Sequence, residues 1–302
     1  MMRVLFGSSS QSNVFRRPSR SPAPRRPPGR SACLALALAV SLGAPAVAAA
    51  QAAGAEATKQ SSSSYVPQVG QQGKDVVWVP TPQVLVDKML ELAKVTPADH
   101  LIDLGSGDGR TVITAARRGI RAHGIEYNPE MVELARRNAA AAGVSERATF
   151  VRADLFETDL SQASVITLFL LPTINEKLRP RLLELKPGTR IVSNTFPMGD
   201  WKPDEQATLT TDCQGWCTAL LWIVPAKVAG SWNMDGQALK LTQTYQQVEG
   251  TLGADPISDV RLRGDEIAFT AKGVRYQGKV NGNTMQGTRT GSAQAAWTAV
   301  RS

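Results

Sequence analysis

Histidine is almost absent from this chain of 302 residues, which contains only His100 and His123. Both lie in or beside stretches that we predict to be strands, so we expect each ring to be a satisfied structural group. No cluster of histidine and aspartate accompanies them. This absence argues against a metal-dependent enzyme of the catechol-modifying kind, and we expect no metal site.

Cysteine is also scarce, with three residues in the whole chain. Cys33 lies in an apolar N-terminal segment, ahead of its core, which is the wrong place for a lipoprotein cysteine. Cys213 and Cys217 flank a short turn, Gln214-Gly215-Trp216. Cysteines that face each other across a tight turn in an exported protein can be bridged, and two free thiols packed as small hydrophobes are the alternative. The sequence leaves both possibilities open.

The N-terminus lacks acidic residues entirely. Residues 1–30 contain seven arginines and no acid, and residues 31–50 contain no charge at all. An arginine-rich stretch followed by an apolar run and small residues is typical of a secretory signal, so we predict a signal peptide over 1–50, cleaved near Ala48 to Ala52. The protein would then be exported to the periplasm. The alternatives are an uncleaved leader that anchors the chain in the membrane and a cytoplasmic product.

Little net charge remains once the leader is set aside. Subtracting its seven positive charges from the formal +8 of the chain leaves +1. The basic character therefore belongs to the leader, and we expect no nucleic-acid partner. Residues 51–74 are rich in Ala, Ser and Gln, which predicts a flexible linker.

A glycine-rich turn follows the apolar run from His100 to Leu104, and one glycine of the dinucleotide pattern is missing from it. The spacing is G-x-G-x-G at Gly105, Gly107 and Gly109, with Arg110 where a dinucleotide fold has its third glycine. Asp103 precedes the turn, and its carboxylate would repel a pyrophosphate but accept hydrogen bonds from a cationic ligand. These features disfavour a nicotinamide dehydrogenase. They favour S-adenosylmethionine, which carries an ammonium, a sulfonium and no phosphate.

Two further acids close the next predicted strands. Glu126 ends the second strand, about 20 residues after the turn, where a carboxylate can accept hydrogen bonds from both ribose hydroxyls. Asp154 follows the third strand and is placed to accept from the adenine amino group, with Leu155 beside it. The predicted cofactor-binding residues are therefore Asp103, Gly105, Ser106, Gly107, Gly109, Glu126, Asp154 and Leu155.

Strands and helices alternate over the middle of the chain. We predict strands at about 99–104, 121–127, 148–152, 163–170 and 189–195, and helices at 82–94, 110–118 and 129–142. A hairpin of 207–211 and 218–224 would complete seven strands. This order predicts an α/β fold, a doubly wound Rossmann-like methyltransferase sheet, over a domain of residues 75–227.

Residues 76–226 resemble a class I methyltransferase and, more narrowly, the seven-strand protein-lysine methyltransferases that include the mitochondrial enzymes acting on an ATP-synthase subunit. The resemblance rests on Val79-Pro80-Thr81-Pro82, the Asp103 to Gly109 turn, Gly124-Ile125-Glu126, Ala153-Asp154-Leu155-Phe156, Thr167 to Pro172 and Phe196 to Trp201. It implies a methyl transfer from S-adenosylmethionine to a protein lysine. It also implies a loop of Pro80, Thr81 and Pro82 over the cofactor, and an acceptor channel lined by Phe169, Leu170, Leu171 and Pro172.

The channel segment lacks the Asn/Asp-Pro-Pro-Tyr sequence usual in enzymes that methylate nucleobase amines, which argues against that class. Methyl transfer from a sulfonium needs little covalent help, because alignment and desolvation supply most of the effect. An apolar channel would itself lower the pKa of a lysine acceptor. We therefore assign no catalytic base. The rival hypothesis is an exported binding or scaffold protein that keeps a degenerate form of this fold, since an exported chain meets little of a cytosolic cofactor.

The C-terminal residues 228–302 change in character. Short alternating runs recur about every 8–10 residues with glycine-rich turns, which predicts a small antiparallel β-barrel or an incompletely closed one. Gly230-Ser231-Trp232 near its start and Arg301 near its end resemble the calycin arrangement, in which an arginine closes over a tryptophan. A barrel of this size has little room for a cavity. We expect an accessory domain filled by its own side chains, and the alternative is a module that binds a small apolar ligand or a peptide.

Overall fold

A computed structural model describes residues 65–291 and 294–302 of the chain. The predicted signal peptide and the predicted linker up to residue 64 lie outside these residues. Within the described part of the chain, no helix is both long and apolar enough to cross a membrane.

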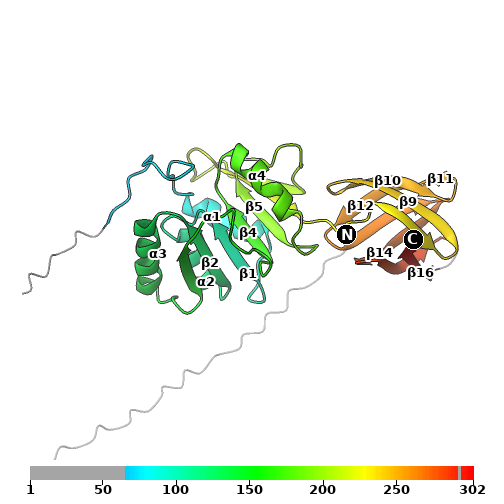
Figure 1. Cartoon of the computed structure of the whole chain (residues 1–302), viewed down its shortest axis with the longest axis horizontal. Coiled ribbons are helices and arrows are strands. Elements are labelled where there is room, and N and C mark those ends of the chain that lie inside the picture. The colour runs from blue at the N-terminus through cyan, green and yellow to red at the C-terminus, as the bar shows by residue number, and fades with distance from the viewer. Residues whose placement is uncertain (1–64, 292–293) are drawn as a thin grey trace, which may run out of the picture. The chain divides into compact units, whose positions relative to one another are not determined.

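The first of two sheets has seven strands, in the order β3-β2-β1-β4-β5-β7-β6. Five strands run parallel, and β7 pairs antiparallel with both β5 and β6. The mixed sheet is the expected doubly wound α/β architecture, completed by the predicted hairpin (Figure 1). Its strands are β1 His100–Leu104, β2 Arg121–Glu126, β3 Ala148–Arg152, β4 Val165–Leu168, β5 Arg190–Asn194, β6 Glu205–Thr208 and β7 Thr218–Ile223.

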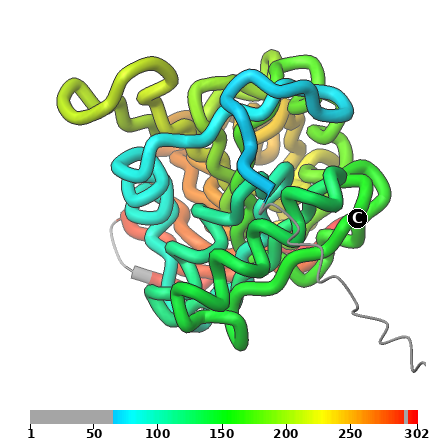
Figure 2. The backbone as a smooth tube through the Cα atoms, turned by 90° about the vertical axis from the view of Figure 1, so that its left-hand side faces the viewer, coloured from blue at the N-terminus to red at the C-terminus, as the bar shows by residue number. Residues whose placement is uncertain are grey.

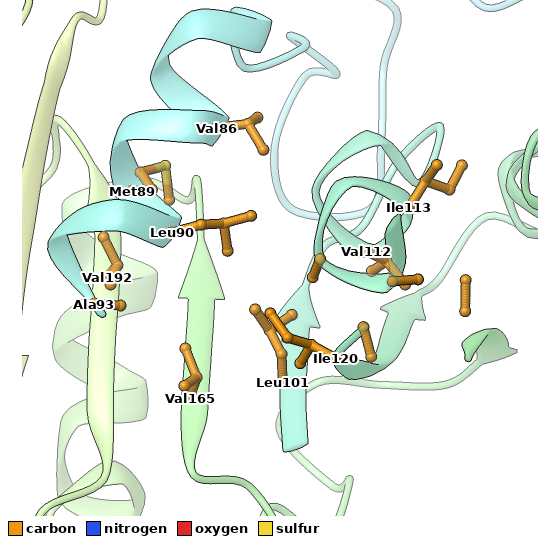
Figure 3. Close-up of a cluster of buried hydrophobic side chains, with 14 of the residues drawn as sticks. Val86, Met89, Leu90, Ala93, Leu101, Val112, Ile113, Ile120, Val165 and Val192 are labelled. Atoms are coloured by element: carbon orange, nitrogen blue, oxygen red, sulfur yellow. The ribbon is translucent and has the colours of Figure 1, made fainter. Parts of the chain in front are cut away.

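Helices cover both faces of this sheet, so its strands are buried on both sides. One core contains apolar side chains of α1 (Gln83–Leu92), α2 (Arg110–Arg117) and α3 (Pro129–Ala141). Figure 3 shows side chains of α1 and α2 in one cluster with Leu101, Val165 and Val192 of the strands. The other core contains the apolar side chains of α4 (Pro172–Leu182).

Helix α4 was not predicted from the sequence. Its residues are on average polar, and Pro180 lies inside it. No side chain caps its N-terminus, where Leu171 occupies the N-cap position. The helix therefore gives only a weak local signal: Ile174, Leu178 and Leu182 recur at helical spacing and Pro172 stands at its first position, but Pro180 and the polar residues obscure the pattern. It is stabilised by burial of residues such as Leu178 and Leu182 in the sheet core.

The second sheet is antiparallel and nearly closed, with the strand order β11-β10-β9-β8-β16-β15-β14-β13-β12. At its open side, β12 comes back alongside β10. The glycine-rich turns and alternating burial therefore form the predicted barrel-like domain. Its strands are β8 Gly230–Met234, β9 Gln237–Thr244, β10 Gln247–Leu252, β11 Asp255–Pro256, β12 Ser258–Arg263, β13 Glu266–Ala271, β14 Val274–Asn281, β15 Thr284–Thr290 and β16 Gln294–Arg301.

The barrel's own side chains fill its interior. Trp232, Phe269 and Met285 are completely buried, and the Trp297 indole donates to the backbone oxygens of Gln277 and Thr288. At the barrel's end, the Arg301 guanidinium lies 4.2 Å from the centre of the Trp232 ring. This is the tryptophan–arginine contact on which the calycin resemblance rests.

Candidate functional site

A cavity of about 380 Å³ lies where the parallel strands end, and most of the predicted site residues line it. Open α/β sheets bind ligands at this edge, and the volume lies within the range of small-molecule sites. Twelve of the predicted residues line the cavity: Pro80, Thr81, Asp103, Gly105, Ser106, Gly107, Glu126, Asp154, Leu155, Phe169, Leu170 and Leu171. Gly109, Pro82 and Pro172 do not.

The three residues outside the lining each stand at the start of a helix. Pro82 is the N-cap of α1, and Pro172 is the first residue of α4. Gly109 is the N-cap of α2 with φ +84°, and a Cβ there would lie 2.7 Å from the Phe150 ring. Gly109 is thus required for backbone conformation and for packing, as expected for the last glycine of the turn.

The glycine turn is held against β2. The amides of Gly105 and Ser106 both donate to the Ile125 carbonyl, and Gly107 is left-handed with φ +53°. A Cβ on Gly107 would lie 2.6 Å from the Trp78 indole nitrogen, so only glycine fits there. The Ser106 hydroxyl is buried and has no hydrogen-bond partner among the residues that the structure describes. A Cβ on Gly124 would lie 2.6 Å from this oxygen, so the hydroxyl packs against β2 rather than opening into the cavity.

Glu126 braces the same turn. Its Oε2 accepts from the Gly107 amide at 2.9 Å, and its Oε1 accepts from the Asn128 amide at 2.9 Å. The carboxylate therefore connects the glycine turn to the start of α3, where Asn128 caps the helix. Each carboxylate oxygen keeps a free lone pair for a further donor, such as a ligand hydroxyl.

Asp103 is the most perturbed acid of the site. Its Oδ1 accepts from the Thr167 hydroxyl at 2.7 Å, and burial raises the pKa of its carboxyl to about 7. The negative charges of Glu126 and Asp108 act in the same direction, while the Thr167 hydrogen bond opposes them. A cationic ligand group close to Asp103 would favour the ionised carboxylate.

Asp154 pairs with a residue that the sequence analysis did not assign to the site. The Lys74 ammonium lies 2.5 Å from Asp154 Oδ2 and 4.5 Å from the centre of the Tyr127 ring. Hydrogen bonds from Lys74 and from the Phe156 amide lower the pKa of the Asp154 carboxyl. The acid predicted to face adenine therefore has an internal cation as its partner.

Lys74 belongs to a segment of residues 65–79 that folds back on itself beside the cavity. The Gly70 amide donates to the Trp78 carbonyl, and the Trp78 amide donates to the Gln71 carbonyl. Residues 71–79 line the cavity. The predicted flexible linker of residues 51–74 therefore includes, at its C-terminal end, residues that belong to the folded site. Glycines, glutamines and a proline interrupt the valines of residues 65–79, so no helical or strand period runs through the segment.

Arg110 is the residue that stands in place of the third dinucleotide glycine. Its guanidinium pairs with Asp108 at 2.6 Å and donates to the Thr81 carbonyl at 2.9 Å. It therefore ties the glycine turn to the loop of Pro80 to Pro82. Arginine at this position has a structural use that glycine could not supply.

Aromatic side chains form the opposite wall. The rings of Phe169 and Phe196 stack with centroids 5.8 Å apart, and the Trp216 ring meets Phe169 edge-on at 6.0 Å. All three line the cavity. Phe169 was predicted, but Phe196 and Trp216 were not assigned to the channel. No local signal in the sequence indicates that Trp216 reaches this wall.

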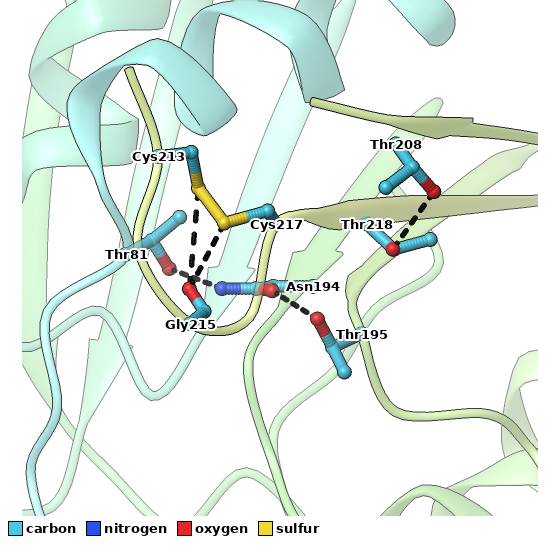
Figure 4. The surroundings of a disulfide bond; sticks show 8 residues. All are labelled: Thr81, Asn194, Thr195, Thr208, Cys213, Gly215, Cys217 and Thr218. Atoms are coloured by element: carbon cyan, nitrogen blue, oxygen red, sulfur yellow. Dashed lines mark hydrogen bonds between the residues drawn. A yellow bond between two sulfur atoms is a disulfide. The ribbon is translucent and has the colours of Figure 1, made fainter. Parts of the chain in front are cut away.

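Trp216 lies on the loop between β6 and β7, which a disulfide closes. Cys213 and Cys217 are bridged, with their Cα atoms 5.9 Å apart, so the first of the two possibilities for these cysteines holds. Figure 4 shows the bridge together with Thr81 and Asn194, whose side chains are joined by a hydrogen bond. In Figure 2 the segment from residue 65 (blue) and this loop (yellow-green) lie at the same side of the sheet, and both contribute to the cavity lining.

The histidines lie apart from this cavity's lining. His123 Nδ1 lies 2.8 Å from the Thr149 hydroxyl, and burial lowers the pKa of its imidazole. Across residues 65–291 and 294–302, no group of three or more His, Cys, Asp and Glu side chains is arranged to hold a metal ion.

Comparisons with known proteins place these features in a family. A profile described as the ANTKMT methyltransferase domain matches residues 103–205. A protein-lysine N-methyltransferase of Saccharolobus islandicus (strain REY15A) is 47% identical over 145 residues, which make up 47% of this chain and 86% of that protein. The adenine nucleotide translocase lysine N-methyltransferase of Mus musculus is 40% identical over 39% of this chain, and the chain spans 52% of that enzyme.

The chain is also similar in sequence to a protein of known structure. A protein from Salinibacter ruber, described as an RNA methyltransferase in complex with S-adenosyl-L-homocysteine, is 51% identical to this chain. The match covers 50% of this chain and 96% of that one, with a TM-score of 0.47.

Proposed function

The chain belongs to the family of S-adenosylmethionine-dependent protein-lysine N-methyltransferases, and from that premise we propose that it methylates the side-chain amine of a lysine in a protein substrate. One observation carries the proposal. Three carboxylates that close successive strands, Asp103, Glu126 and Asp154, line a single cavity with the glycine turn and an apolar aromatic wall. This donor and acceptor set suits a cationic, phosphate-free nucleoside.

The residues fit S-adenosylmethionine in their chemistry. We assign Asp103 to the amino-acid end, since its Oδ1 accepts from Thr167 and its Oδ2 accepts from no described residue, with Ser106 beside it in the cavity lining. Glu126 is assigned to the ribose hydroxyls, and Asp154 with Leu155 to the adenine. When bound, the cofactor supplies a methyl group on a positively charged sulfur, which is already activated for transfer.

The chain's own contribution is positioning and exclusion of water. Phe169, Leu170 and Leu171 offer an apolar path along the end of β4, and Thr81 faces it from the loop before α1. A lysine amine that enters such a path loses hydration, which lowers its pKa and favours the neutral nucleophile. Alignment of that amine then supplies most of the rate effect, and no side chain is assigned as a base.

A titration followed by a transfer assay tests the proposal. We expect calorimetry of the purified protein to give micromolar binding of S-adenosylmethionine and none of NADH. The protein should then transfer a labelled methyl group to poly-L-lysine but not to fully acetylated poly-L-lysine, which lacks primary amines. Asp103→Ala and Glu126→Ala should each weaken cofactor binding several-fold or more.

Other outcomes separate the rivals. Cofactor binding without transfer to any amine would favour the binding or scaffold protein. The same assay can be run in parallel with RNA in place of poly-L-lysine. Transfer of the labelled methyl group to RNA and not to poly-L-lysine would contradict a protein substrate. Unchanged affinity in both carboxylate variants would overturn the site assignment.

We also propose that the N-terminal leader exports the protein and is cleaved near Ala48 to Ala52; the alternative is an uncleaved leader that anchors the protein in the membrane. The bridged Cys213 and Cys217 support this, because disulfides persist in oxidising compartments. The test is to isolate the protein from the envelope fraction of its source cells and to determine its N-terminal sequence. A mature start near Gln51 is expected, and a full-length cytosolic product would contradict export.

A further inference from the structure

Trp216 is an unusual residue for a turn. Its side chain is 46% exposed although it is large and apolar, and its backbone is left-handed with φ +49°. An aromatic residue adopts this conformation only at a cost in free energy, so the surrounding structure must impose it.

The loop that carries Trp216 is closed from both sides. The Cys213–Cys217 bridge spans a separation of only four residues, and Asp212 and Gly215 also have positive φ angles. Just below the bridge, the Leu209 amide donates to the Cys217 carbonyl and the Thr195 amide donates to the Thr218 carbonyl. These bonds fix the loop to the ends of β5 and β7. The indole is therefore presented to the cavity by a constrained loop.

The strand order places Trp216 on the acceptor side of the cavity. The sheet runs β3-β2-β1-β4-β5-β7, so the carboxylates at the C-terminal ends of β1, β2 and β3 lie toward one half of the sheet. Phe169 follows β4, Phe196 follows β5 and Trp216 precedes β7, which puts all three on the other side. Their ring contacts form one continuous aromatic wall.

We propose that Trp216, held by the disulfide-closed loop, is the outer wall of the acceptor channel and positions the incoming lysine side chain. A lysine has an apolar stem and a cationic head, and an aromatic face attracts both. Trp216 is a positioning residue for the acceptor and does not hold the cofactor. This inference deepens the proposed lysine methylation and depends on it.

The test compares substrate and cofactor parameters in the full chain. For Trp216→Ala we expect the KM for poly-L-lysine to rise at least about fivefold, with little change in kcat and with S-adenosyl-L-homocysteine affinity within about twofold of wild type. Trp216→Phe should restore much of the loss. The double variant Cys213→Ser, Cys217→Ser should raise KM in the same direction, because it releases the loop. Val300→Ala, which truncates an exposed apolar side chain on β16, is the control.

Several outcomes would overturn the inference. Weakened cofactor binding in Trp216→Ala would make the indole part of the cofactor site, and a fall in kcat at constant KM would exclude a positioning role in acceptor binding. If the wild type transfers no methyl group, the inference is tested by binding instead: the protein saturated with S-adenosyl-L-homocysteine is titrated with poly-L-lysine in a calorimeter. Poly-L-lysine binding that is lost in Trp216→Ala would support the positioning role even though the proposed reaction fails. Poly-L-lysine binding that the variant leaves unchanged, or that is absent in the wild type, would overturn the positioning role.

Discussion

At the scale of single residues, the sequence indicates where the site's acids lie but not how they are paired. Asp103 and Glu126 lie in the last two residues of their strands and Asp154 follows the next one, and parallel strands bring such positions to one edge. The Lys74 partner of Asp154 could not be predicted, because it is 80 residues away and lies in a segment without periodicity. The two hydrogen bonds that Glu126 accepts from backbone amides also depend on side-chain geometry that no motif encodes.

The raised pKa of Asp103 gives a prediction for the stability of the cofactor-free protein. Because burial raises the pKa from 3.8 to about 7, the folded state holds a proton that the unfolded state has lost between these values. The free energy of unfolding should therefore decrease, through this group, as pH rises from 5 to 7. Asp103→Asn should remove this part of the slope, as measured by urea unfolding at each pH.

Asp154→Asn is the matched control for that experiment. The pKa of Asp154 is lowered, so its contribution is present above the unfolded pKa and is lost only as pH falls below about 4. Its removal should leave the slope between pH 5 and 7 unchanged. An Asp103→Asn variant with the wild-type slope would show that Asp103 is ionised in the fold.

Glu126 gives a second prediction at this scale. Glu126→Gln keeps the shape of the side chain but loses the charge that strengthens its hydrogen bonds to amides and to ligand hydroxyls. We expect the Kd for S-adenosyl-L-homocysteine to rise about tenfold by calorimetry. Glu130→Gln, which changes an acid in the first turn of α3 outside the cavity lining, should have no such effect. Equal affinities in the two variants would contradict the assignment of Glu126.

At the scale of elements, most strands and three helices of the α/β unit could be predicted from apolar runs and cap signals. The Asn128-Pro129 start of α3 is an example, since the asparagine side chain accepts from Glu130 and Met131 amides. Helix α4 is missing from the prediction, because Pro180 and the polar residues of the segment obscure the helical spacing of its apolar residues, which becomes plain only from their burial. The loop from β6 to β7 could not be predicted in full either. The sequence does not decide whether Cys213 and Cys217 are bridged, and the contact of Trp216 with Phe169 joins residues far apart in the chain.

The glycine turn offers a prediction for helix packing. Gly109 and Gly143 are both left-handed, but a Cβ on Gly109 would meet Phe150 and Ala135 within 3 Å, whereas no described atom lies within 4 Å at Gly143. Gly143→Ala should cost only the backbone strain of about 1–2 kcal/mol. Gly109→Ala should add an overpacking cost of about 1–3 kcal/mol, measured as the free energy of unfolding in urea. Equal losses would mean that α3 can shift to admit the methyl group.

At the scale of the whole molecule, the two sheets were predicted as separate domains, and the contacts between them were not. The turn from β9 to β10 places Tyr245 against the buried Trp201, with ring centroids 5.9 Å apart. The Gln246 side chain accepts from the Trp201 indole at 3.0 Å and donates to the Lys202 carbonyl. A turn sequence shows only that the chain reverses, so this docking could not be predicted.

This contact predicts coupled unfolding. Tyr245→Ala would uncover Trp201, and we expect it to lower the temperature of unfolding and to separate the two sheets into distinct calorimetric transitions. Tyr245→Phe should be nearly neutral, because the lost hydrogen bond is to Asp200, whose side chain is exposed. Lys272→Ala, in another left-handed turn of the barrel, is the control, since its ion pair with Asp255 is exposed. A single unchanged transition in Tyr245→Ala would show that the contact contributes little.

The distribution of the six tryptophans has an optical consequence. Trp201, Trp222, Trp232 and Trp297 are sealed inside the two cores, whereas Trp78 and Trp216 border the cavity, one on the side of the glycine turn and one on the aromatic wall. The four sealed indoles form a constant background of emission. Changes in intrinsic fluorescence therefore come from the two ends of the cavity. With Trp78→Phe or Trp216→Phe, each end becomes a separate reporter that needs no added dye.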